Sequence, residues 1–227
     1  MIEIEDAAGG RVAAYRAPVP PDARGRVVLL HDWWGLTDSV RRAADRLADA
    51  GYDTIAPDLY DGYCPQTPLE AMRHLTDLDL DAVVEGPARA AATHMGALVA
   101  MVGFSLGGRV AMIAAGRGLS CRGFISFYGI PGPDEVGIES IRQPVQVHLC
   151  RGDDFFRSGR QPAVAAELEG AAVDHQVYWY DAPHGFVDEA RGAYDERAAA
   201  LAWERAMAFL HERVAAEAVV GDRISLP

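Results

Sequence analysis

Short apolar runs alternate along this chain with longer segments in which apolar residues recur every three or four positions. The runs predict buried strands at 26–30, 54–57, 97–102, 123–128, 144–149 and 174–180. The longer segments predict helices that begin at Thr37 or Asp38, at Leu69, just after Ser105, at Gln161 and at Glu189. This alternation predicts an α/β protein with a mostly parallel central sheet and helices on both faces.

Turn and stop signals refine this pattern. Residues 1–17 indicate a β-hairpin that precedes the first buried strand. The helical segment at 69–95 should break at Gly86-Pro87, because proline cannot donate to the helical ladder. The last helix is expected over about 189–218, with a tail at 221–227. No linker or internal repeat interrupts the 227 residues, so we expect a single domain across them.

Polar residues follow several of the predicted strands directly. They are His31-Asp32, Ser105, Asp153-Asp154 and His184. In parallel sheets, ligands bind beyond the carboxyl ends of the strands. These side chains are therefore expected to share one edge of the sheet and to form the functional site.

The string Gly103-x-Ser105-x-Gly107 lies between an apolar strand and an alanine-rich helix. The string alone is a weak signal, but this context is typical of a nucleophile elbow. Glycines are needed on both sides of the serine because a Cβ there would collide with the neighbouring strand or helix. The first N–H groups of the following helix lack intrahelical partners and can stabilise an oxyanion. We expect Leu106 N–H to be one donor and Trp33 N–H to be the other.

A serine hydroxyl becomes a useful nucleophile when a histidine removes its proton and a carboxylate orients that histidine. Ser105, then Asp153 or Asp154, then His184 occur in the chain order of the α/β-hydrolase fold. Aromatic residues near these positions are candidates for an apolar pocket, with core packing as the alternative and the one favoured for Trp34 and Phe156. They are Trp33, Trp34, Phe155, Phe156 and Phe186.

The net charge, the length of the apolar segments and the spacing of the cysteines exclude several classes of function. The formal charge of −12 disfavours nucleic acid and anionic membranes as partners. No apolar segment approaches the length of a membrane span, and the N-terminus has no signal-peptide pattern. Cys64, Cys121 and Cys150 lie far apart without paired spacing, which favours a reducing, cytoplasmic setting and argues against structural zinc. We expect neither a metal nor a cofactor.

Several motifs in this order resemble the dienelactone hydrolase family. They are His31-Asp32-x-x-Gly35-Leu36, Ala56-Pro57-Asp58-Leu59-Tyr60, Gly103-Phe104-Ser105-Leu106-Gly107-Gly108, Phe127-Tyr128-Gly129, Gly152-Asp153-Asp154-Phe155 and His184-Gly185-Phe186. The resemblance implies an α/β-hydrolase domain without a large lid. It also implies hydrolysis of small esters or lactones, of the carboxymethylenebutenolidase type, through an acyl-enzyme intermediate. It places the triad aspartate on Asp153.

The chain departs from the family pattern at three positions. The family's usual nucleophile is cysteine, and Ser105 stands there; the family commonly has glutamate where this chain has Asp32. We expect Asp32 to order its loop and to have a minor role at the site. The family's substrate-binding arginine falls on Asp188, which disfavours dienelactone itself. Arg73 is a further candidate for the pocket.

Other functions fit the same residues. The acyl group could pass to an acceptor other than water, as in an acyltransferase or perhydrolase. Alternatively, a hydrolase fold can serve as a non-catalytic ligand-binding or regulatory module. In each case the expected partner is a small molecule, and for a hydrolase it is an ester or a lactone. We expect the chain to be a monomer or a small homo-oligomer.

Overall fold

The computed structural model describes residues 1–96, 99–132, 134–153 and 159–214. It contains one eight-stranded sheet with the strand order β1-β2-β4-β3-β5-β6-β7-β8. The strands are β1 (Ile2–Glu5), β2 (Arg11–Arg16), β3 (Gly25–Leu30), β4 (Tyr52–Pro57), β5 (Val99–Phe104), β6 (Gly123–Phe127), β7 (Val145–Cys150) and β8 (His175–Tyr180). β1 and β2 form an antiparallel hairpin, and β2 pairs antiparallel with β4. The remaining strands, in the sheet order β4-β3-β5-β6-β7-β8, are parallel to one another. The expected hairpin and mostly parallel sheet are confirmed.

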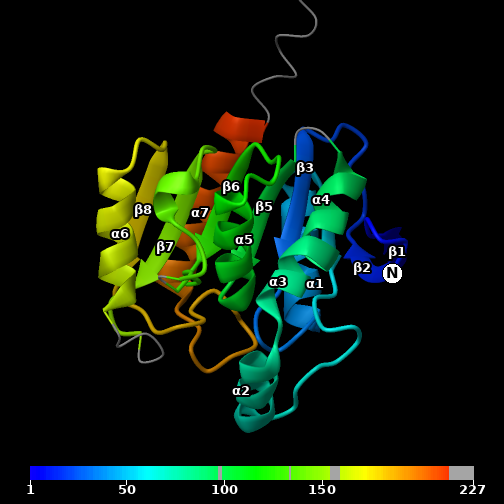
Figure 1. Cartoon of the computed structure of the whole chain (residues 1–227), viewed down its shortest axis with the longest axis horizontal. Helices are drawn as coiled ribbons and strands as arrows, with labels where there is room; N and C mark the ends of the chain where they lie inside the picture. Colours follow the sequence, from blue (N-terminus) through cyan, green and yellow to red (C-terminus); the bar gives the residue numbers. More distant parts are fainter. Residues whose placement is uncertain (97–98, 133, 154–158, 215–227) are drawn as a thin grey trace, which may run out of the picture.

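Helices cover both faces of this sheet. Figure 1 shows α4, α5 and α6 in front of it and α1 and α7 behind it. The helices are α1 (Asp38–Asp49), α2 (Pro68–Asp77), α3 (Leu80–Val83), α4 (Arg89–Met95), α5 (Leu106–Gly116), α6 (Arg160–Gly170) and α7 (Glu196–Val214), with a π-helical turn at Val84–Ala88 and a 3₁₀ turn at Ile138–Ser140. Within the described residues, no helix has the length and apolar character needed to cross a membrane.

The alternation of side chains along the central strands builds a core on each face. In β3, Val28 and Leu30 belong to the cluster that includes α4, α5 and α6, whereas Val27 and Leu29 belong to the cluster that includes α1 and α7. All four side chains are fully buried. The continuous apolar run in the sequence therefore reflects burial on both faces, as expected for a central parallel strand.

The α-helix is interrupted at Gly86-Pro87, as predicted, and a second break that was not predicted lies at Leu78. There the backbone is extended, and α3 begins after Asp79, whose side chain accepts a hydrogen bond from Ala82 N–H at 3.0 Å. Pro87 lies inside the π-helical turn that joins α3 to α4. A π-helical turn interrupts the regular i→i−4 ladder, so it accommodates a residue that lacks the N–H.

The start of the last helix was predicted incorrectly. α7 begins at Glu196, and turns occupy the residues from 189 to 195. Asp195 accepts a hydrogen bond from Ala198 N–H at 2.9 Å, as an N-terminal cap does. The predicted end of this helix and the predicted tail at 221–227 lie outside the described residues.

Candidate active site

The turn between β5 and α5 holds Ser105 in a strained backbone conformation. Its φ of 50° and ψ of −110° lie where a residue with a Cβ is rarely found. The glycines around it allow this turn to form. A Cβ on Gly103 would lie 2.1 Å from the carbonyl of Gly107, and one on Gly107 would lie 2.3 Å from the carbonyl oxygen of Leu30. The strand-to-helix turn expected from the sequence is present, and it raises Ser105 at the carboxyl edge of the sheet.

A chain of hydrogen bonds connects Ser105, His184 and Asp153. Ser105 Oγ lies 2.8 Å from His184 Nε2, and His184 Nδ1 lies 2.7 Å from Asp153 Oδ2. With Nδ1 donating to the carboxylate oxygen, Nε2 is the ring nitrogen that accepts from the serine hydroxyl. The structure thus brings together three residues that lie far apart in the sequence. Asp154, the alternative acid, lies outside the described residues.

A fourth side chain, Gln161 of α6, supports Asp153. Its Nε2 donates to Asp153 Oδ2 at 2.9 Å, the same oxygen that His184 contacts. Gln161 and Asp153 are only 3% and 8% exposed. The sequence placed Gln161 at the start of a helix but gave no sign of this contact, because a lone glutamine in an amphipathic helix resembles a surface residue.

The expected oxyanion donors lie on the two turns that flank the serine. Leu106 is the first residue of α5, so its N–H has no intrahelical acceptor. Trp33 lies in the loop after β3, and its side chain packs against Trp34 with a ring distance of 5.4 Å. Asp32 Oδ1 accepts from Trp34 N–H at 2.8 Å, and this bond fixes the loop, as expected for Asp32. Exclusion of water raises the pKa of Asp32, although the Trp34 N–H opposes the shift.

His31 holds the same loop through two hydrogen bonds of its ring. Its ring is fully buried, its Nδ1 lies 2.7 Å from Asp32 O, and Leu59 N–H donates to its Nε2 at 2.9 Å. In these contacts Nδ1 donates to the carbonyl of Asp32 and Nε2 accepts from the backbone of Leu59. The polar residues after β3 therefore serve the backbone geometry of the loop that carries Trp33.

The model of the dienelactone hydrolase family matches residues 12–214. The chain belongs to the dienelactone hydrolase family. It is 30% identical to a putative carboxymethylenebutenolidase of Aquifex aeolicus, with 92% of this chain and 96% of the relative covered. It is also 30% identical to a carboxymethylenebutenolidase of Pseudomonas putida, with 86% of each chain covered. The family and these relatives identify the chain as a hydrolase.

Solved structures agree with the fold. A putative dienelactone hydrolase from Klebsiella pneumoniae superposes with a TM-score of 0.75 at 20% identity, over 92% of this chain and 97% of that one. The α/β-hydrolase fold expected from the motifs is confirmed, and the described residues form no large lid.

In this member of the family, Tyr128 packs directly against the imidazole of His184. The ring centroids of Tyr128 and His184 lie 4.7 Å apart, and Tyr128 N–H donates to His148 O at 2.7 Å. Its φ of 47° is unusual for a bulky residue. Burial, followed by the charge of Asp32, raises the pKa of Tyr128 well above its ordinary value. The hydroxyl therefore remains protonated at neutral pH.

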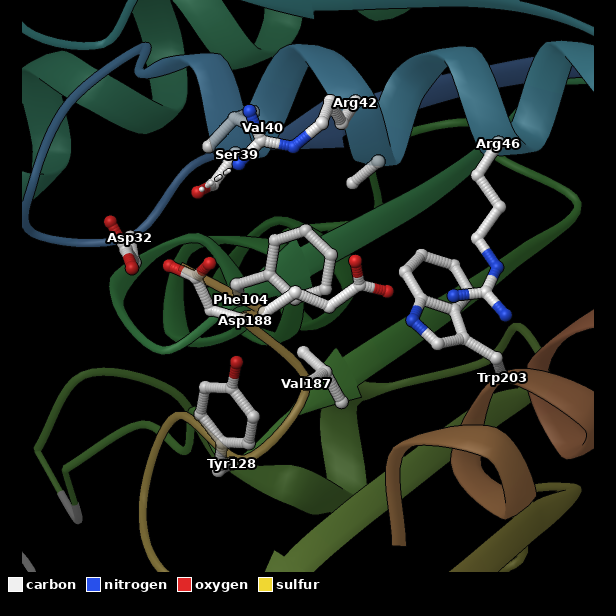
Figure 2. Close-up of a pocket in the computed structure, with 12 residues that line it drawn as sticks. Asp32, Ser39, Val40, Arg42, Arg46, Phe104, Tyr128, Val187, Asp188 and Trp203 are labelled. Atoms are coloured by element: carbon white, nitrogen blue, oxygen red, sulfur yellow. Dashed lines mark hydrogen bonds between the residues drawn. The ribbon is translucent and has the colours of Figure 1, made fainter. Parts of the chain in front are cut away.

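A pocket of about 190 Å³ opens beside Tyr128, between α1, the end of β5, the loop before α7 and α7 itself (Figure 2). Its lining residues are Asp32, Ser39, Val40, Arg42, Ala43, Arg46, Phe104, Tyr128, Val187, Asp188, Glu189 and Trp203. Asp32, which is expected to have a minor role at the site, is among these lining residues. Sequence reasoning missed most of the others, because Val40, Phe104 and Trp203 have the pattern of ordinary core residues.

Among the described residues, the others that the sequence suggested for a substrate pocket do not line this one. Phe186 is fully buried in the core, with its ring 5.6 Å from that of Tyr128, so it supports the site from within. Trp34 lies under the guanidinium of Arg191 at 4.1 Å. Arg73 is exposed on α2 and is not among the lining residues. Phe155 and Phe156 lie outside the described residues.

The charges that line the pocket are mixed, with three carboxylates (Asp32, Asp188 and Glu189) and two guanidinium groups (Arg42 and Arg46). Asp188, at the position where the resemblance places an arginine, lines the pocket together with Asp32. Its carboxylate is 3.4 Å from Arg191 Nε. Across the described residues, no group of three or more His, Cys, Asp or Glu side chains is arranged to hold a metal ion.

Proposed function

We propose that this protein hydrolyses small carboxylic esters or lactones through an acyl-enzyme formed on Ser105. The observation that carries the proposal is the continuous hydrogen-bond chain from Ser105 Oγ through His184 to Asp153. This arrangement gives the hydroxyl a base within reach and gives the base an orienting carboxylate.

In the first half of the reaction, Ser105 Oγ attacks the carbonyl carbon while His184 Nε2 takes the hydroxyl proton. The oxyanion of the tetrahedral intermediate is stabilised by the N–H groups of Leu106 and Trp33. The bond to the alcohol oxygen then breaks, and that oxygen takes the proton from Nε2. In the second half, water gives a proton to His184 Nε2 and attacks the acyl carbon. The bond from that carbon to Ser105 Oγ then breaks, and Oγ takes the proton from Nε2, which releases the acid and restores Ser105.

Serine suits this site because its hydroxyl is neutral before substrate arrives. A thiolate nucleophile would have to be held against premature reaction, whereas Ser105 is activated only as His184 removes its proton. Asp32 is then left to order the Trp33 loop, which fits its hydrogen bond to Trp34 N–H.

A p-nitrophenyl acetate assay with the wild type, Ser105→Ala and His184→Ala tests the mechanism. Loss of either side chain should lower kcat by several powers of ten. Covalent labelling by a fluorophosphonate should modify the wild type and not Ser105→Ala. Full activity in Ser105→Ala would refute the mechanism, and no labelling of the wild type would favour a non-catalytic binding role.

Transfer of the acyl group to an acceptor other than water uses the same residues and differs only in what attacks the acyl-enzyme. Product analysis with added alcohols or hydrogen peroxide as competing acceptors separates transfer or perhydrolysis from hydrolysis.

A further inference from the structure

The pocket beside Tyr128 combines an apolar wall with charged side chains and the Tyr128 hydroxyl. Its apolar wall comes from α1, β5, the loop before α7 and α7, through Val40, Ala43, Phe104, Val187 and Trp203. An apolar cavity of about 150 Å³ is large enough to hold benzene. A pocket of about 190 Å³ therefore has room for one six-membered ring with a small substituent.

The hydroxyl of Tyr128 is directed into this pocket, as Figure 2 shows. Tyr128 is only 2% exposed, and it is one of the residues that line the pocket. A phenolic hydroxyl that lines a pocket can donate a hydrogen bond to a ligand bound there and can accept one from it. The strained backbone of Tyr128 supports the same conclusion, because such strain is concentrated at functional sites.

The carboxylates of Asp32 and Asp188 lie on the side of the pocket toward which the Tyr128 hydroxyl points (Figure 2). They accept hydrogen bonds from a ligand that carries a donor and repel a ligand that carries a negative charge. The cations of the lining lie on α1. Arg42 donates to Ser39 Oγ at 3.1 Å, and Arg46 stacks over Trp203 at 5.0 Å.

We propose that this pocket binds a neutral, hydroxyl-bearing ring of the substrate, such as a phenolic or cyclic-alcohol group. Tyr128 donates to the oxygen of that hydroxyl, which in turn donates to Asp32 or Asp188. The assignment to the substrate rests on the proposed ester or lactone hydrolysis. It follows from the position of Tyr128, whose ring lines the pocket and also contacts His184.

Binding can be measured separately from catalysis by ligand-observed NMR on Ser105→Ala, with phenol as the probe. Toluene tests the need for the hydroxyl, and benzoate tests the exclusion of an anion. We expect phenol to bind more tightly than either. Equal or tighter binding of benzoate would overturn the proposal, since Arg42 or Arg46 would then dominate the site.

Variants locate the binding. In the Ser105→Ala background, Tyr128→Phe should reduce the preference for phenol over toluene by about 3- to 10-fold, the contribution of one hydrogen bond. Ala43→Phe should abolish phenol binding by filling the pocket, and the smaller Ala43→Leu should weaken it if the larger variant fails to fold. Ala166→Phe, on the exposed face of α6, is the matched control and should bind phenol normally. Unchanged phenol binding in Ala43→Leu would refute the assignment.

A kinetic measurement separates this inference from the proposed function. Phenol should inhibit hydrolysis of p-nitrophenyl acetate by the wild type competitively. If phenol binds but does not inhibit an active enzyme, the pocket is not the substrate's and the inference fails while the hydrolase proposal survives. If no ester is hydrolysed while phenol still binds in the Tyr128-dependent manner, the proposed function fails and the ring site survives.

Discussion

Replacing Gln161 by leucine tests whether Asp153 needs support from α6. The change removes the Nε2 donor, which lies 2.9 Å from Asp153 Oδ2, and keeps a buried side chain of similar size. A hydrogen bond to a charged group contributes about 1.5–3 kcal/mol. If the whole of this energy stabilises the transition state, in which an imidazolium forms beside Asp153, its loss should lower kcat/KM by about 10- to 100-fold.

The effect should appear in kcat, because Gln161 contacts Asp153 and is not among the residues that line the proposed ring site. The assay is p-nitrophenyl acetate hydrolysis at several substrate concentrations, with thermal unfolding measured in parallel. Gln143→Leu is a matched control, since Gln143 donates to Leu119 O at 3.4 Å and has no contact with Asp153. Wild-type kcat in a folded Gln161→Leu protein would refute the positioning role.

Gln161→Glu gives a second readout that a purely structural role would not produce. Two carboxyl groups at hydrogen-bond distance do not ionise together readily. Once both are ionised, the added negative charge favours the protonated imidazole of His184. The pH at which kcat/KM reaches half its maximum on the acid side should therefore rise. An unshifted pH profile would show that Gln161 does not act on the imidazole through Asp153.

Three further predictions concern the nucleophile, the acid and a buried histidine. Ser105→Cys should retain fluorophosphonate or thiol-reagent labelling at residue 105, which mass spectrometry of the labelled peptide can detect. Asp153→Asn should lower kcat by roughly 10⁴-fold, whereas Asp154→Asn should remain within a few-fold of wild type; the reverse result would exchange their roles. Burial lowers the pKa of His148 to about 3, so the unfolded state alone takes up its proton as the pH falls below about 6.5. Stability should then decrease by about 1.4 kcal/mol per pH unit from pH 6.5 toward pH 3, and urea unfolding should show a weaker dependence in His148→Gln.

The sequence was sufficient to predict which elements meet at the site. Ser105, Asp153 and His184 each follow a strand, and the carboxyl ends of parallel strands share one edge, so their convergence follows from topology. The same reasoning predicted the hairpin and the burial of β3 on both faces. These predictions depend on periodic patterns and chain order, which a single sequence contains.

The details that failed depend on competition between local signals and packing. Pro87 interrupts the α-helix only through a π-helical turn, whereas the chain leaves the helical conformation at Leu78, where Asp79 caps a new helix. Likewise Asp195, rather than the residues near 189, sets the start of α7. The contact of Gln161 with Asp153 and the residues of the pocket wall were not predicted. Contacts between side chains of different elements do not alter the periodic pattern of apolar residues in the sequence.

The two turns that frame the imidazole form one structural unit. Ser105 and Tyr128 both have positive φ values, and each contacts His184, one through a hydrogen bond and the other through its ring. Ser105 N–H donates to Phe127 O, and a Cβ on Gly129 would lie 1.9 Å from Ser105 O. Each strained turn is thus held in place by the backbone of the other. The contacts between these turns therefore hold both Ser105 beside the base and Tyr128 in the wall of the pocket, so the placement of the proposed nucleophile and the shape of the proposed ring site depend on the same contacts.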